Sequence, residues 1–149
     1  MSNVAKRINL VSIKMVKEAS FLYQTRTISS PYDAYEMIKD QLQDLDREQF
    51  IIACLNTKNE PTNITVVSVC SLNKAIVHPR EVFKTAILSN AASIMAFHNH
   101  PSGDTTPSQQ DLQLTNRLYE AGELLGIKLL DHLIIGDGSF TSLKEKGYL

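Results

Sequence analysis

The stretch that decides the fold is residues 94–111, which read IMAFHNHPSGDTTPSQQD. Its apolar beginning predicts a strand, and His98 and His100, two residues apart, then point to the same side of that strand. Ser108 is typical of a helix N-cap, and Asp111, three residues later, takes the place of the acidic residue of a capping box. The stretch therefore predicts a strand, a loop and a helix that bring two imidazoles, a hydroxyl and a carboxylate close together.

His98, His100 and Asp111 offer two imidazole nitrogens and one carboxylate oxygen with metal-site spacing. Three protein ligands and one open position are typical of a catalytic zinc site, whereas structural zinc sites are closed by four ligands that are rich in cysteine. The alternatives are that the histidines have a structural role and that Ser108 and Asp111 form only a helix cap. The residues alone leave both interpretations open.

Length and composition predict a single domain. The chain has 149 residues, which is enough for one domain with its own core. A formal net charge of -1 gives no overall positive field that would favour nucleic acid. No run of about 18 apolar residues predicts a membrane span and no signal-type segment opens the chain, so we expect a cytoplasmic protein. Cys54 and Cys70 lie in apolar runs and are expected to be buried, reduced thiols.

Apolar periodicity, caps and turns predict alternating helices and strands. Residues 1–29 are expected to form an N-terminal extension with one strand near 8–15, packed on a domain that comprises residues 30–149. Helices are predicted at 31–45, 80–91 and 108–125, and strands at 48–55, 64–69, 94–97, 127–135 and 140–143. The predicted fold class is α/β (α+β), with a mixed central sheet that is mostly antiparallel.

The spacing His-x-His, seven residues, Ser-x-x-Asp resembles the JAMM signature of the JAB/MPN metalloprotease superfamily, whose better-known members cleave ubiquitin isopeptide bonds. The sequence around these residues is closer still to that of the RadC family, a bacterial group once labelled as DNA repair proteins. The resemblance covers about residues 30–149 and rests on Leu55-Asn-Thr-Lys-Asn59, His78-Pro-Arg-Glu-Val-Phe83, His98-Asn-His-Pro-Ser-Gly103, Pro107-Ser-x-x-Asp111, Leu114-Thr115 and Leu130-Asp-His-Leu-Ile-Ile-Gly136.

The resemblance implies a cytidine-deaminase-like arrangement of three layers, α-β-α. Two departures from the family's pattern are visible. Cys70 stands where the family usually has glycine, and we find no counterpart of the helix-hairpin-helix region that precedes this domain in longer relatives. We therefore expect the most obvious DNA-contacting part of the family to be missing here.

The resemblance also implies one Zn²⁺ per chain, held by His98, His100 and Asp111. In JAMM proteins the general base is a glutamate at the beginning of an early strand that lies beside the metal strand. Glu48 matches that position. Glu81 is the competitor, although its place at a helix start also fits a capping carboxylate.

Five further residues have an implied role and a plainer alternative. In the JAMM pattern Ser108 stabilises the oxyanion or orients the metal-bound water, and it also suits an N-cap. Asp131 and His132 could be partners that hold the metal-binding imidazoles, or a structural pair. His78 and Arg80 are similar cases, because Arg80 could bind a substrate carboxylate or pair with a neighbouring acidic residue.

The resulting hypothesis is a zinc-dependent hydrolase, a metallopeptidase or isopeptidase-like enzyme with a peptide or protein substrate. One alternative is a DNA repair or recombination protein, for which the sequence offers neither a basic stripe nor an aromatic stacking platform. Another is a non-catalytic interaction module. A cytidine deaminase is excluded, because that site requires His-x-Glu and a Pro-Cys-x-x-Cys pair. A second copy of the chain is a further candidate partner, through an exposed strand in the N-terminal part.

Overall fold

The computed structural model describes residues 3–70 and 77–149 and has three helices and five strands in that part of the chain. They are α1 (Pro31–Leu42), β1 (Glu48–Leu55), β2 (Pro61–Cys70), α2 (Pro79–Leu88), β3 (Ser93–Asn99), α3 (Gln109–Leu125), β4 (Lys128–Ile135) and β5 (Phe140–Ser142). The strands form one sheet in the order β2-β1-β3-β4-β5, and β3 and β4 are its parallel pair among the described residues. The predicted mixed, mostly antiparallel sheet is therefore confirmed.

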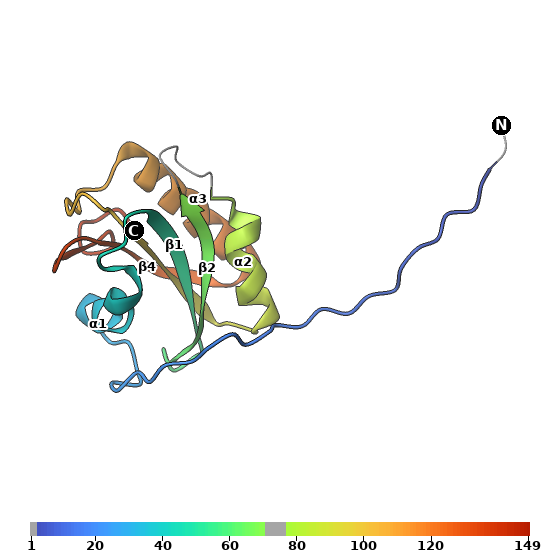
Figure 1. The fold of residues 1–149 in the computed structure, drawn as a ribbon, viewed down its shortest axis with the longest axis horizontal. Helices are drawn as coiled ribbons and strands as arrows, with labels where there is room; N and C mark the ends of the chain where they lie inside the picture. The colour runs from blue at the N-terminus through green and yellow to red at the C-terminus, as the bar shows by residue number, and fades with distance from the viewer. Residues whose placement is uncertain (1–2, 71–76) are drawn as a thin grey trace.

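The sheet is the middle of three layers (Figure 1). Along β1, alternate residues belong to two separate cores: Ile51 packs in a cluster with α1, and Ile52 packs in a cluster with α2 and α3. Both side chains are almost fully buried. Because both faces of the strand are covered, its sequence is a continuous apolar run rather than an alternating one.

Local sequence signals account for the beginning of α1, and backbone geometry for its end. The Ser30 hydroxyl accepts a hydrogen bond from the Asp33 N–H, and a proline follows the cap at the first helical position. The helix ends at Leu42, whereas the sequence predicted an end near Leu45. Asp44 has a φ of 65°, which is outside the helical region. Leu45 still packs against the α1 core, which explains why it fitted the helical pattern.

The N-terminal extension differs from the prediction. Residues 3–22, which we call the N-terminal tail, contain neither helix nor strand and are exposed throughout, so the predicted strand at 8–15 is wrong. Figure 1 shows the tail as an extended segment that leads away from the domain. A short apolar segment forms a stable strand only beside other strands, and the described residues supply no neighbour for this one.

Packing of the extension on the domain begins only after the tail. Tyr23 and Ile28 contact the α1 core, and the Ile28 N–H donates to the Asn59 carbonyl at 2.9 Å. Arg26 pairs with Glu60 at 2.6 Å. These contacts fix the chain beside the turn between β1 and β2.

Two smaller predictions concern the membrane and the cysteines. None of the helices in the described part of the chain has the length and apolar character needed to span a bilayer. Cys54 is a buried free thiol, and burial raises its pKa, which makes the thiol less reactive. The side chain of Cys70 lies outside the described residues.

Candidate metal centre

His98, His100 and Asp111 come together at the carboxyl end of β3 and the first turn of α3. His98 Nε2 lies 3.0 Å from His100 Nε2 and 3.3 Å from Asp111 Oδ1, and His100 Nε2 lies 3.2 Å from Asp111 Oδ2. One ligand atom from each residue lies within 4.8 Å of the others, so the three could hold a metal ion. The predicted grouping of these side chains is therefore present.

The Nδ1 atoms of both histidines, which face away from the other ligand candidates, have hydrogen-bond partners. His100 Nδ1 lies 2.7 Å from the Asp104 carbonyl oxygen, which can only accept, so Nδ1 carries a hydrogen. His98 Nδ1 lies 2.8 Å from Nε2 of His132. In each ring Nε2 is consequently the nitrogen that faces the other two ligands.

The electrostatics of the group favour a bound cation. Burial disfavours the ionised form of Asp111, but hydrogen bonds from His100 and His98 outweigh burial and hold the pKa of this carboxyl far below its usual range. The hydrogen bond to Asp111 raises the pKa of His100 against the opposing effect of burial, and the Asp104 carbonyl and the charge of Glu48 add to the rise. A proton or a metal ion is therefore stabilised between these side chains.

Ser108 and Asp111 form the helix cap that the sequence offered as the plainer interpretation. The Ser108 hydroxyl accepts from the Asp111 N–H at 3.1 Å, and the Ser108 N–H donates to Asp111 Oδ2 at 2.8 Å. The Asp111 carboxylate faces the histidines at the same time, because its two oxygens have about four lone-pair sites. Capping and a metal-ligand role are thus compatible.

Glu48 lies on the same side of the sheet as the two histidines. It is the first residue of β1, and Phe50, two residues on, pairs with His98 across the strands and stacks on its ring at a centroid distance of 6.1 Å. The period of two in a strand gives Glu48 and Phe50 the same orientation. Its effect on the pKa of His100 agrees with this placement.

Asn99 fixes the backbone on both sides of Glu48. Its side-chain oxygen accepts from the Gln49 N–H at 2.7 Å, and its amide nitrogen donates to the Arg47 carbonyl at 2.9 Å. Asn99 is buried, so water does not compete for these bonds. The end of β1 is thereby held against the end of β3.

Glu81, Arg80 and His78 do not belong to the group of three metal-ligand candidates. Glu81 is exposed in the first turn of α2 and pairs with Lys84 at 2.9 Å, and this hydrogen bond lowers the pKa of its carboxyl. Arg80 is exposed, and His78 is the N-cap residue of α2 but makes no capping bond with its side chain. Glu81 therefore takes part in an exposed ion pair on α2, and no capping hydrogen bond of its side chain is found among the described residues.

Asp131 and His132 point to opposite faces of the sheet. One extra residue, Leu130, interrupts the pairing of β4 with β3, and such a bulge reverses the orientation of the residues that follow it. His132 contacts His98, and burial lowers its pKa well below the usual value. Asp131 instead accepts hydrogen bonds from the Ser142 hydroxyl and the Lys144 N–H, which tie β4 to the C-terminal segment.

The sequence analysis assigned no role in the site to Asn99, Asp104 or Thr115. Thr115 had a usable signal, because it follows Asp111 by four residues and so lies on the same face of the helix. Asn99 and Asp104 act through an amide on the far side of the strand and through a backbone carbonyl, respectively. Neither kind of contact has a sequence pattern.

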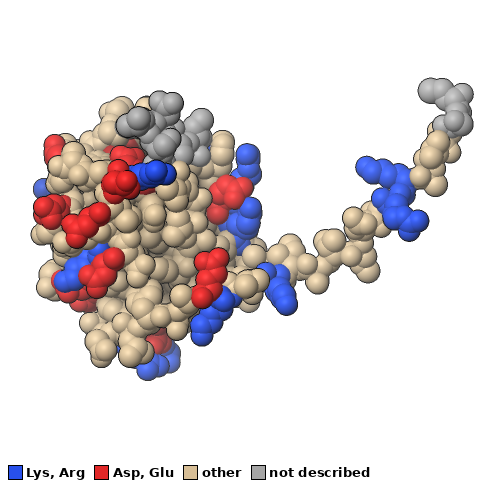
Figure 2. Space-filling model, viewed as in Figure 1, with Lys and Arg blue, Asp and Glu red and all other residues tan. Residues whose placement is uncertain are grey.

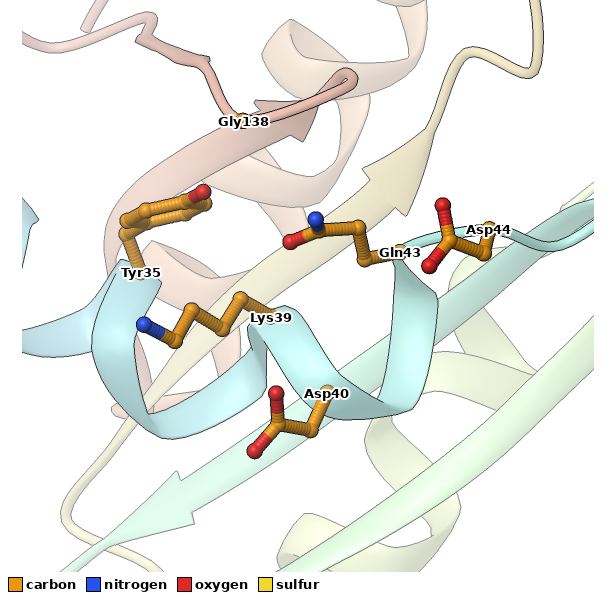
Figure 3. A pocket seen from close by; sticks show the side chains of 6 residues that line it. All are labelled: Tyr35, Lys39, Asp40, Gln43, Asp44 and Gly138. Atoms are coloured by element: carbon orange, nitrogen blue, oxygen red, sulfur yellow. The ribbon is translucent and has the colours of Figure 1, made fainter.

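A hollow of about 460 Å³ lies elsewhere, beside α1 and the turn after β4 (Figure 3). Because α1 covers the sheet face opposite to α3, this hollow is separate from the metal centre, and its lining includes none of the three ligand candidates. On the visible face of the domain, positive and negative side chains are interspersed (Figure 2). That face shows no basic stripe of the kind that a nucleic acid would need.

Comparisons with known proteins identify the family of this chain. Residues 28–148 match the family described as RadC-like JAB domain. The chain is 54% identical over 131 residues to a UPF0758 protein of Moorella thermoacetica, with 88% of this chain and 57% of that protein covered. It is 50% identical over 136 residues to the UPF0758 protein YsxA of Bacillus subtilis, with 91% and 57% covered. The chain thus spans a little over half the length of these curated relatives.

Proposed function

Because the chain belongs to the RadC-like JAB domain family, we propose that it is a zinc-dependent hydrolase of the metallopeptidase or isopeptidase type. The JAB domain family includes metalloproteases, whereas the UPF0758 names state no activity. One observation carries the proposal. Both histidines direct Nε2 toward the Asp111 carboxylate, so three ligand atoms converge at 3.0 to 3.3 Å, and a metal ion can take the place of the protons that these hydrogen bonds hold.

The three side chains fit zinc in number and kind. Two imidazole nitrogens and one carboxylate oxygen leave the fourth position open, as in catalytic sites. When bound, zinc lowers the pKa of a coordinated water to about 7 and polarises a substrate carbonyl. In our proposal Glu48 would take a proton from the attacking water and return it to the leaving group. Its orientation and the hydrogen bonds of Asn99 on either side of it support this assignment over Glu81.

Ser108 completes the proposed machinery. Because its hydroxyl oxygen accepts the Asp111 N–H, the hydroxyl hydrogen is free to donate. That hydrogen would stabilise the negative charge that develops on the carbonyl oxygen of a peptide substrate. The position of Ser108 next to the carboxylate ligand supports this role.

Elemental analysis of the purified protein tests the metal site. We expect about one zinc per chain after dialysis without chelator, and the loss of zinc in His98→Ala and in Asp111→Asn. The asparagine variant is the sharper one, because its side chain still accepts the Ser108 N–H and thus keeps the helix cap. A folded wild-type chain that takes up no added zinc contradicts the proposal.

Peptide and isopeptide substrates then test hydrolysis. We expect Glu48→Gln to bind zinc as the wild type does and to lose activity by a factor of about 100 or more, because the general base is gone. Glu81→Gln is the matched control and keeps activity, because Glu81 is paired with Lys84. Zinc binding without hydrolysis in the wild type would favour an interaction module, and salt-sensitive DNA binding would favour the repair hypothesis.

A further inference from the structure

We infer that His132 and Thr115 are positioning residues that determine which nitrogen of His98 faces the metal. This inference rests on the proposed zinc site. It concerns a continuous series of hydrogen bonds, which we call the relay. The relay starts at His98, passes through His132 and Thr115, and ends at the backbone of Asp111. The relay therefore begins and ends at two of the three ligand candidates.

The direction of every hydrogen bond in this chain follows from its last member. The Asp111 carbonyl can only accept, so the Thr115 hydroxyl donates to it at 2.7 Å. With its hydrogen committed, Thr115 Oγ1 accepts from Nδ1 of His132, 2.6 Å away. In neutral His132 the other nitrogen, Nε2, is then an acceptor.

The tautomer of His98 follows from that of His132. Its Nδ1 lies 2.8 Å from Nε2 of His132 and must donate the hydrogen of that bond. In neutral His98, Nε2 is then left with a free lone pair, and this is the nitrogen that lies 3.3 Å from Asp111 Oδ1. A carbonyl of helix α3 thus selects the metal-binding tautomer of a histidine on β3.

The groups of this relay are buried, and in the described part of the chain the Thr115 hydroxyl and the two ring nitrogens of His132 have no other hydrogen-bond partner. His132 is fully buried, and Thr115 and His98 have relative exposures of 1% and 5%. Phe50 covers the His132 ring edge-on at a centroid distance of 5.4 Å. Water is therefore kept away from the nitrogens, and an incorrect tautomer would leave a buried polar atom unpaired.

Two features of the fold, a bulge in β4 and the spacing of residues in α3, bring the members of the relay together. The bulge at Leu130 brings His132 to the α3 side of the sheet, and one helical turn separates Thr115 from Asp111. Three successive elements, β3, α3 and β4, thereby hold one imidazole in a single orientation. Outer partners of this kind commonly change metal affinity by about 10- to 100-fold when they are removed.

Two variants of one residue test the relay. Thr115→Val is nearly isosteric but can neither donate nor accept, whereas Thr115→Ser keeps the hydroxyl. We expect the zinc Kd of Thr115→Val to increase by about 10-fold or more, and that of Thr115→Ser to stay near the wild-type value. Competition with a chromophoric chelator measures both. Equal zinc affinity in all three proteins would overturn the inference.

A second readout can be taken on the wild type alone and without zinc, and Thr115→Val extends it. Long-range ¹H–¹⁵N spectra of the imidazoles report which nitrogen carries the hydrogen. We expect His132 protonated at Nδ1 alone in the wild type, both with and without zinc, and this signature should be lost in Thr115→Val. A His132 protonated at Nε2 would overturn the relay. If the wild type binds no zinc, the proposed function fails, and the tautomer of His132 still decides the relay.

Discussion

At the residue scale, protons and metal ions compete for Nε2 of His100. The hydrogen bond to Asp111 raises the pKa of His100 above its ordinary value of 6.5, so the metal-free protein keeps this proton to a higher pH than a free histidine does. Without metal, the proton contributes to folding stability below pH 6.5, and that contribution is lost as the pH rises through the raised pKa. A metal ion replaces the proton in the same place.

The sign of this competition predicts how zinc affinity depends on pH. We expect the apparent affinity to increase with pH by about tenfold per unit while one proton is displaced, and to level off above the raised pKa of His100. Calorimetric titrations in buffers of different ionisation enthalpy measure the affinity and the proton release together. Binding that is independent of pH and releases no proton below the raised pKa would contradict the assignment of His100 as a ligand.

At the element scale, the turn after β4 supports the loop that orients His100. A Cβ at Gly136 would lie 2.5 Å from the Gly103 carbonyl and 2.6 Å from a methyl carbon of Thr105, so only glycine allows this approach. Thr105 is also bound to Thr141 at 2.7 Å. The loop between β3 and α3 is thus fixed against β4 and β5, and with it the Asp104 carbonyl.

This contact predicts that Gly136→Ala weakens zinc binding without touching a ligand. The added methyl must push the loop away, at a cost of about 1–3 kcal/mol in the free energy of unfolding, and the Asp104 carbonyl moves with the loop. Urea unfolding and zinc titration measure the two effects. Gly138→Ala is the control, because its Cβ would meet no atom within 4 Å and its φ of +69° makes the substitution a backbone effect alone. Equal zinc affinity in both variants would contradict a role of the Gly136 contact in orienting His100.

The same scale shows what the sequence could predict. The capping signals of Ser108 and Asp111 and the spacing of His98 and His100 depend on neighbours within one element, and the structure has both. The orientation of His132 depends on a bulge inside an apolar strand, where the sequence has no signal for an extra residue. The sequence therefore brought the ligand candidates together but left the choice between Asp131 and His132 open.

At the scale of the whole molecule, the chain consists of a three-layer domain and an N-terminal tail with an unusual surface. The tail is extended in Figure 1 and exposes large apolar side chains along its length. These are Val4, Ile8, Leu10, Val11, Ile13, Met15, Val16, Phe21 and Leu22. The tail precedes the packed segment that begins at Tyr23, and it leads away from the domain (Figure 1). The tail and the proposed site are thus distinct parts of the molecule.

This separation predicts the course of limited proteolysis. Trypsin should cleave first after Lys6, Arg7, Lys14 and Lys17, because an exposed segment without secondary structure fits the protease cleft and the folded domain does not. Mass spectrometry of a time course identifies the products, which should still bind zinc with the affinity of the intact chain. Protection of Lys14 and Lys17 that grows with protein concentration would contradict a free tail. It would instead favour pairing with a second copy, because β2 lies at an edge of the sheet and exposes Val66 and Val69.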